Sequence, residues 1–124
     1  MLSIFLEIPL ALNKPVSFFT LMEKRYELVF DNVMIKQLKQ AAKNNHVKKI
    51  LTKMLDKLEL AGPYVGKLLD SKLHLYEIKN KSPPIRLYYR HKENEIYVFE
   101  FEMKTSDKKQ KETIKKVKSK VLET

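Results

Sequence analysis

The strongest constraint on the fold is a pair of alternating segments, residues 85–90 and 95–103. Apolar and polar side chains alternate along most of both segments, apart from the apolar run 96–99, and this period of two is typical of β-strands because successive side chains point to opposite faces. The four residues between them, 91–94, are short enough to form the loop of an antiparallel hairpin. The chain is therefore expected to contain a hairpin with one apolar and one polar face.

The two faces of this hairpin predict different environments. The apolar face must be covered by helices, and it consists of Ile85, Leu87, Tyr89, Tyr97, Phe99, Phe101 and Met103. The other face carries Arg86, Tyr88 and Arg90 together with Glu100 and Glu102. In the simplest hairpin register, Arg86 lies near Glu100 and Tyr88 near Val98. Such a polar face can bind phosphate, or it can be a solvent face of ion pairs that contribute about 0–1 kcal/mol each.

The remaining segments predict an α+β domain. Tyr26, Leu28 and Phe30 alternate as in an N-terminal strand, and two apolar stripes at helical spacing follow, in residues 34–41 and 47–58. Gly62 and Pro63 end the second helix, and residues 73–79 read as another strand. A lysine-rich amphipathic helix, capped by Thr105, Ser106 or Asp107, completes the chain. The expected architecture is a strand, two helices, an antiparallel sheet packed on helices, and a basic C-terminal helix.

Residues 1–21 differ from the rest of the chain. They are apolar but are interrupted by Glu7, Pro9, Lys14 and Pro15, so they lack the uninterrupted run of about 20 residues that crosses a bilayer. They also lack the positive start of a signal peptide. We expect residues 1–21 to be a loosely attached arm or the product of a mis-assigned start, residues 22–124 to form a single domain, and the protein to be cytoplasmic.

Charge and residue usage narrow the function. The chain has 25 Lys and Arg against 15 Asp and Glu, a net charge of +10, which favours polyanionic partners, nucleic acid first. Genome composition or solubility is the alternative explanation of the lysines. The absence of cysteine excludes a thiolate metal site and a cysteine nucleophile. Two glycines cannot build a Gly-rich phosphate loop, and the three histidines lack metal-ligand spacing. We expect no cofactor and no metal.

Four short motifs follow one another along the chain. They are a Gly-containing turn with a nearby lysine (residues 62–69), a strand similar to Glu-Leu-Arg (75–79), a strand similar to Tyr-Arg-Ile/Val-Phe-Tyr (85–89), and an ending similar to Phe-x-Lys-Lys-Thr before a basic helix (98–105). In this order they resemble the RelE/ParE toxin superfamily, and its HigB-like branch fits best. The likeness runs from about Tyr26 to Val121.

The resemblance implies the toxin of a type II toxin–antitoxin system, a ribosome-dependent mRNA endonuclease that needs no metal. The RNA 2′-hydroxyl would attack the scissile phosphate, giving a 2′,3′-cyclic phosphate and a 5′-hydroxyl. Arg86 would stabilise the charge of the transition state, with Lys79 and Lys104 as further catalytic residues. The expected RNA-binding residues are Lys67, Tyr88, Arg90, Thr105 and Lys108. The partners would be mRNA on the ribosome and a cognate acidic antitoxin.

Two alternatives remain. One is a ParE-like inhibitor of DNA gyrase, which would leave RNA intact. The other is a non-catalytic basic nucleic-acid-binding relative. Lys79 stands where the motif has arginine, Met103 stands where it has lysine, and Glu100 with Glu102 adds negative charge. These departures favour the non-catalytic alternative.

Overall fold

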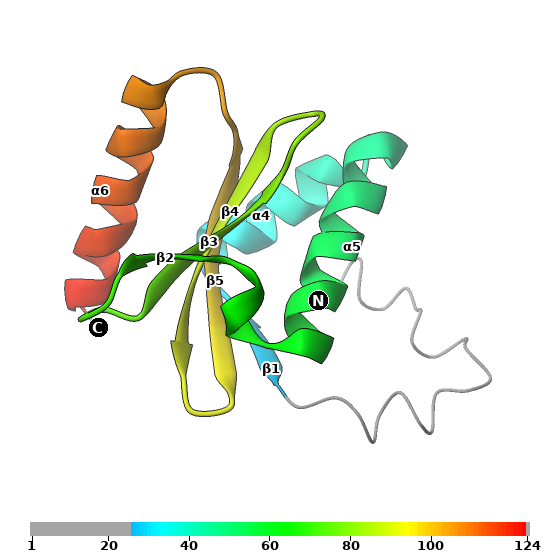
Figure 1. Ribbon diagram of the computed structural model, residues 1–124. Coiled ribbons are helices and arrows are strands. Elements are labelled where there is room, and N and C mark those ends of the chain that lie inside the picture. Colours follow the sequence, from blue (N-terminus) through cyan, green and yellow to red (C-terminus); the bar gives the residue numbers. More distant parts are fainter. Residues whose placement is uncertain (1–25, 124) are drawn as a thin grey trace, which may run out of the picture.

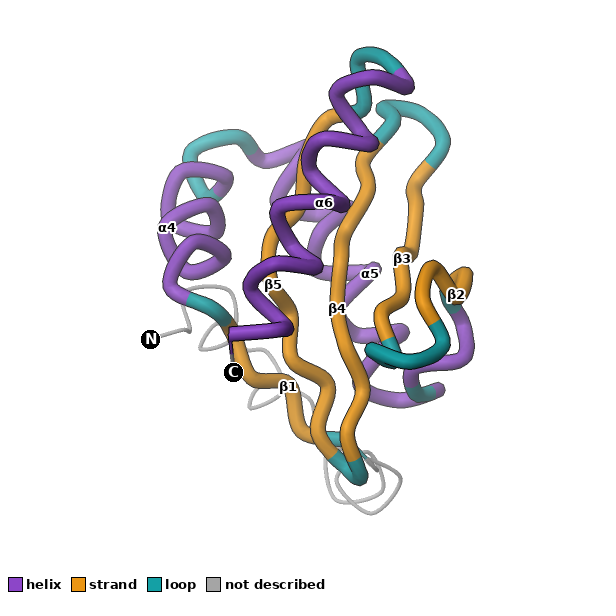
Figure 2. The backbone as a smooth tube through the Cα atoms, turned by 90° about the vertical axis from the view of Figure 1, so that its left-hand side faces the viewer, coloured by secondary structure: helices purple, strands orange, loops and turns teal. Residues whose placement is uncertain are grey.

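The computed structural model describes residues 26–123 as one mixed five-stranded sheet between two layers of helices (Figures 1 and 2). Helices α4 and α5 cover one face, and α6 lies across the other. The strand order is β1-β5-β4-β3-β2. The elements are β1 (Glu27–Phe30), α4 (Asn32–Ala41), α5 (Asn45–Ala61), the 3₁₀ turn η1 (Pro63–Val65), β2 (Lys67–Asp70), β3 (Leu75–Asn80), β4 (Ile85–Lys92), β5 (Glu95–Met103) and α6 (Asp107–Glu123). The α+β fold class predicted from the sequence is confirmed.

Side-chain caps explain where the helices begin. The Asp31 carboxylate accepts a hydrogen bond from the Val33 amide at 3.0 Å, and the Asn44 side chain accepts two amide bonds at the start of α5. Ser106 does the same for α6, accepting from the Lys109 amide at 3.1 Å. Each cap satisfies backbone donors that have no partner inside the helix. Of the three cap candidates predicted for the C-terminal helix, Ser106 is the one that caps it.

The larger core lies between the sheet and helices α4 and α5. Fully buried side chains of the helices pack against the inward side chains of β4 and β5. These residues include Met34, Leu51, Leu58, Ile85, Leu87, Tyr89, Ile96 and Val98. The first strand joins the sheet through parallel pairing of β1 with β5. The helical stripes and the apolar face of β4 are therefore correctly predicted.

The register of the hairpin differs from the simplest one. Arg86 pairs with Glu102 and Tyr88 pairs with Glu100, and the register shifts directly after Tyr88. This irregularity leaves Phe99 as an extra residue in β5, which is the arrangement of a β-bulge. A single extra residue reverses the facing of every side chain on one side of it. The predicted placement of Tyr97 and Phe99 on the same face as the β4 core residues is wrong for this reason.

The face predicted to be polar and open is covered by α6 (Figure 2). A second core joins this helix to the sheet, and it consists of Leu75, Tyr88, Phe99, Val117 and Val121, with Tyr97 packed against it. A strictly alternating pattern does not predict this core, because the bulge places Phe99 on the face that carries Arg86, Glu100 and Glu102. The sheet is therefore packed on both faces.

Strand β2 was not predicted. It has four residues at the edge of the sheet, and its pairing with β3 is irregular between Leu68 and Asp70, so it shows no alternation that a sequence pattern could reveal. The prediction about residues 1–21 lies outside the described residues. Within residues 26–123, no helix combines the length and apolar character needed to cross a membrane.

Candidate functional site

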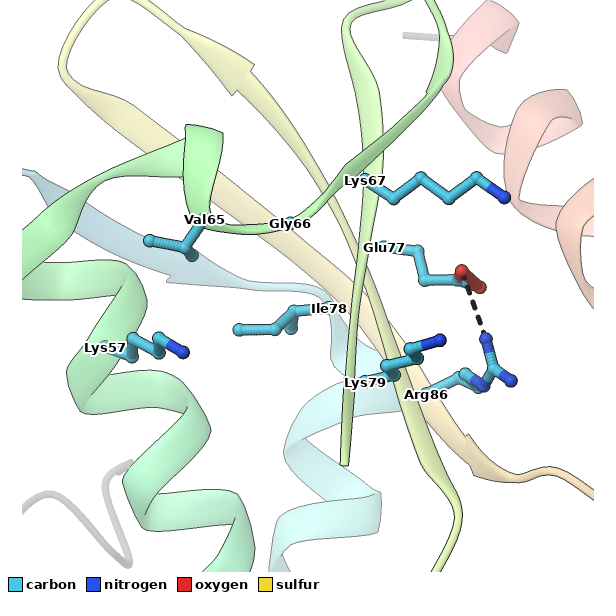
Figure 3. Close-up of a pocket in the computed structure, with 8 residues that line it drawn as sticks. All are labelled: Lys57, Val65, Gly66, Lys67, Glu77, Ile78, Lys79 and Arg86. Carbon is cyan, nitrogen blue, oxygen red and sulfur yellow. Dashed lines mark hydrogen bonds and ion pairs between the residues drawn. The ribbon is translucent and has the colours of Figure 1, made fainter. Parts of the chain in front are cut away.

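A basic hollow of about 350 Å³ lies beside β3, where that strand continues past its pairing with β2. Four cationic side chains and one carboxylate line it (Figure 3). We call it the basic hollow; its lining residues are Lys57, Val65, Gly66, Lys67, Glu77, Ile78, Lys79 and Arg86. The excess of positive charge in a concave site suits an anionic ligand.

The turn before β2 brings Lys67 to the hollow. α5 ends at Ala61 and is capped by Gly62, whose φ of +93° is a conformation that glycine adopts without strain. The Tyr89 hydroxyl then donates to the Pro63 carbonyl at 2.6 Å. A Cβ on Gly66 would overlap that hydroxyl and lie 2.5 Å from the Glu77 carbonyl oxygen. Only glycine therefore allows this close approach of turn and strand.

Pairing of β3 with β4 places two more cations together. Lys79 and Arg86 are cross-strand partners, so their side chains project from the same face of the sheet. Lys79 is exposed, whereas the Arg86 side chain is 16% exposed. Its Nη1 lies 3.3 Å from Oε1 of Glu77, and its buried Nε has no hydrogen-bond partner within the described structure. Arg86 is thus anchored at one nitrogen and retains further donor capacity.

Three carboxylates of the sheet are bound by successive turns of α6. Gln110 donates to Oε2 of Glu77 at 2.6 Å, and Thr113 donates to Oε1 of Glu102 at 2.6 Å. The third contact is an ion pair of 3.2 Å between Lys116 and Glu100. The α6 partners recur every three residues, which keeps them on one side of the helix. This polar row holds α6 against the sheet beside the second core.

Tyr88 was predicted to bind RNA, and its position argues against a direct contact. Its side chain is 0% exposed, and its hydroxyl donates to Oε2 of Glu102 at 2.6 Å. Burial, followed by the hydrogen bond and charge of Glu102, raises the pKa of Tyr88 above its usual range. In this conformation Tyr88 is a packing and hydrogen-bonding residue under α6.

The structure gathers Lys67, Lys79 and Arg86 of the predicted site residues in the basic hollow and leaves the others outside it. Lys104 pairs instead with Asp107 at 2.7 Å.

The other predicted residues lie elsewhere. Thr105 lines a different hollow, beside Lys109 and Lys116. Arg90 pairs with Leu75, toward the opposite end of β4 from Arg86. Lys108 is an exposed residue of the first turn of α6.

Sequence reasoning missed two charged residues that line the hollow. Lys57 lies on α5 and reaches the hollow from the face of β3 opposite to Glu77 and Arg86 (Figure 3). In the sequence it belongs to a lysine-rich helix face, which is more often solvated surface. Glu77 is a charged residue of the expected strand 73–79, and nothing in the sequence pattern indicates that its side chain is only 3% exposed.

The hollow can bind a phosphodiester and stabilise negative charge on it, because arginine and lysine donate charge-assisted hydrogen bonds to phosphate oxygens. No histidine is among the described residues that line it. Across residues 26–123, no three His, Cys, Asp or Glu side chains gather as metal ligands would.

Solved structures of E. coli proteins have a similar fold. A chain of the intact RelBE toxin–antitoxin complex superposes with a TM-score of 0.51 and 22% identity, covering 65% of this chain and 99% of that chain. The isolated RelE toxin gives a TM-score of 0.53 and 21% identity, over 74% and 98% of the two chains. An arginine-to-alanine double mutant of RelE in the free state gives a TM-score of 0.57 and 24% identity. This match covers 75% of the chain described here and 98% of the RelE chain.

No family model and no curated protein matches the sequence of this chain. At the identities given above, the likeness is one of fold. Residues 26–123 have the RelE fold, with the C-terminal helix in place.

Proposed function

We propose that this chain, which shares the fold of E. coli RelE, is the toxin of a toxin–antitoxin pair and cleaves mRNA on the ribosome. The observation that carries the proposal is the basic hollow, where Arg86 and Lys79 are cross-strand neighbours and two further lysines complete the lining. The motifs in residues 62–105 that resemble the HigB-like branch include three of these four cations.

The proposed chemistry uses the substrate's own nucleophile. The RNA 2′-oxygen attacks the adjacent phosphorus and passes its proton to a water molecule, while the bond from phosphorus to the 5′-oxygen breaks. Arg86 stabilises the additional negative charge on the phosphoryl oxygens, and a protonated lysine of the hollow donates a proton to the departing 5′-oxygen. Removing one such preorganised donor typically slows catalysis by about 100–1,000-fold.

The test is expression of the full chain in a reconstituted translation system, with primer extension on the translated mRNA. We expect cuts that require ribosomes, that disappear with Arg86→Ala and that weaken with Lys79→Ala. Lys81→Ala is the matched control, because Lys81 is an exposed lysine two residues away that does not line the hollow. Intact mRNA at confirmed folded protein would contradict the proposal, and inhibition of gyrase would then identify the ParE-like alternative.

A non-catalytic phosphate-binding relative is the second candidate. Two observations favour it: Glu77 already pairs with Arg86, and Lys104 pairs with Asp107 rather than lining the hollow. This protein would bind RNA with a strong salt dependence and would leave it uncut.

The proposed partner of the toxin is an acidic antitoxin, by analogy with the chain of the RelBE complex. With a net charge of +10, this chain would associate faster with an acidic partner, and salt would slow that association. Mixing the chain with the product of a neighbouring small gene, and measuring association rates at low and high salt, tests this expectation.

A further inference from the structure

The carboxylate of Glu77 is an unusual member of a phosphate-binding hollow. It is the only carboxylate among the described charged side chains that line the hollow, all the others being cationic. Its side chain is also almost fully buried, at 3% exposed. A buried carboxylate requires compensation for lost hydration, and Glu77 obtains it from two elements. Oε1 lies 3.3 Å from Nη1 of Arg86, and Oε2 accepts from Gln110 of α6 at 2.6 Å.

These contacts argue against a direct chemical role for Glu77. A general base must reach the proton that it removes, and both carboxylate oxygens are occupied while the side chain is almost fully buried. A negative group also repels the phosphate that the surrounding cations attract. The geometry therefore leaves Glu77 a role that acts through its neighbours.

The contact with Glu77 restricts the orientation of the Arg86 guanidinium. A long side chain loses considerable conformational freedom when it is held in one orientation, and a cation in a reacting site is effective only when its orientation is fixed in advance. Glu77 anchors one nitrogen of the guanidinium. Gln110 in turn fixes the Glu77 carboxylate from the far side, so the orientation of Arg86 depends on a chain of contacts from α6 to β4.

We propose that Glu77 is the positioning residue for Arg86: it fixes the guanidinium at the basic hollow and is itself fixed by Gln110. This inference rests on the proposed function. It predicts opposite effects on RNA affinity and on the cleavage rate when the charge of Glu77 is removed. Binding of RNA becomes tighter because the hollow loses its carboxylate, whereas cleavage slows because Arg86 is no longer held.

The test compares the full wild-type chain with Glu77→Gln, Arg86→Ala and the double variant on ribosome-bound mRNA. We expect Glu77→Gln to lower kcat about 10–100-fold, the scale of a misplacement near 1 Å, and to lower KM. In the Arg86→Ala background the same substitution should have no further effect, because residues that act as one unit are not additive. Arg86→Ala is therefore assayed at enzyme levels that keep its residual rate measurable.

Glu100→Gln is the matched control. Glu100 is also 3% exposed and is also bound by α6, through Lys116, but it does not line the hollow. Its substitution should leave kcat per folded molecule unchanged. A similar fall in kcat for both glutamines would show that loosening of α6 explains the effect, and it would overturn the positioning role. An unchanged or raised kcat for Glu77→Gln would overturn it as well.

A spectroscopic readout separates this inference from the proposed function. The Nε–H signal of Arg86 in a ¹H–¹⁵N NMR spectrum should be sharp in the wild-type protein and in Glu100→Gln, and broadened in Glu77→Gln. If the wild-type chain does not cut mRNA, the proposed function fails, while this spectrum still decides whether Glu77 orders Arg86. A sharp Arg86 signal in Glu77→Gln refutes the inference whatever the chain does to RNA.

Discussion

Replacing Tyr88 with phenylalanine removes one hydroxyl from the interface between α6 and the sheet. That hydroxyl donates to Oε2 of Glu102 at 2.6 Å, and the other Glu102 oxygen accepts from Thr113. A hydrogen bond to a charged group contributes about 1.5–3 kcal/mol. Glu102 is only partly buried, so water replaces some of the lost bond, and we expect Tyr88→Phe to lower the free energy of unfolding by about 1.5 kcal/mol.

Urea denaturation at neutral pH measures this loss, which corresponds to a fall of roughly 1 M in the midpoint for a protein with a typical urea dependence. Tyr97→Phe is the matched control. Its ring is partly exposed and packs against Phe99 at 5.1 Å between centroids, and none of the hydrogen bonds found among residues 26–123 involves its hydroxyl. We expect a change within about 0.5 kcal/mol for the control.

The pH dependence follows from the raised pKa of Tyr88. Because burial raises the folded-state pKa above the unfolded value of about 10, the contribution of the neutral hydroxyl is fully present below pH 10. It is lost as the pH rises from there toward the folded-state value. The wild-type protein should therefore lose stability more steeply above pH 10 than Tyr88→Phe.

Two results would refute this reasoning. One is a Tyr88→Phe variant whose free energy of unfolding falls no further than that of the Tyr97→Phe control. The other is a Tyr88→Phe variant that stays fully stable but loses cleavage, which would place Tyr88 in contact with RNA and overturn its assignment as a buried packing residue.

Three further predictions address the hollow and the α6 interface. Gly66→Ala should lower the free energy of unfolding by about 1–3 kcal/mol in a thermal or urea melt, since its Cβ would overlap Tyr89 and the Glu77 carbonyl; a neutral result would mean that the turn moves away easily. Lys104→Ala should slow mRNA cleavage far less than the loss of a lysine inside the hollow, and an equal loss would place Lys104 at the substrate. Phe99→Ala should destabilise the protein by about 3–5 kcal/mol, because its side chain is 2% exposed under α6; a loss below 1 kcal/mol would contradict the second core.

Part of the candidate site could be predicted because the motifs and the strand alternation each involve residues that are close together in the sequence. Arg86 and Lys79 stand at positions of short motifs, and alternation placed them on one face of the sheet, where they are paired across β3 and β4. Lys57 could not be found in this way, because a lysine on an amphipathic helix looks the same whether it faces solvent or a site. Its role depends on how α5 packs beside β3.

The sequence alone determined every α-helix and strand except β2, and it also determined the β4 side of the first core. Apolar side chains at periods of two and 3.6 specify strands and helices, and local caps such as Ser106 mark where helices begin. Periodicity also selected the β4 face that carries Leu87 and Tyr89, which packs against α4 and α5. These features depend on neighbours within a few residues, so a linear pattern records them.

Only the tertiary structure decided which face of the sheet is buried by α6 and which charges meet. The bulge at Phe99 shifts the register by one residue, and that shift turns a predicted open face into a second core. The pairing of Glu77 with Arg86 and Gln110 joins β3, β4 and α6, the last of them 33 residues away from Glu77 in the chain. Contacts across such separations depend on packing geometry, which the order of residues along one strand does not specify.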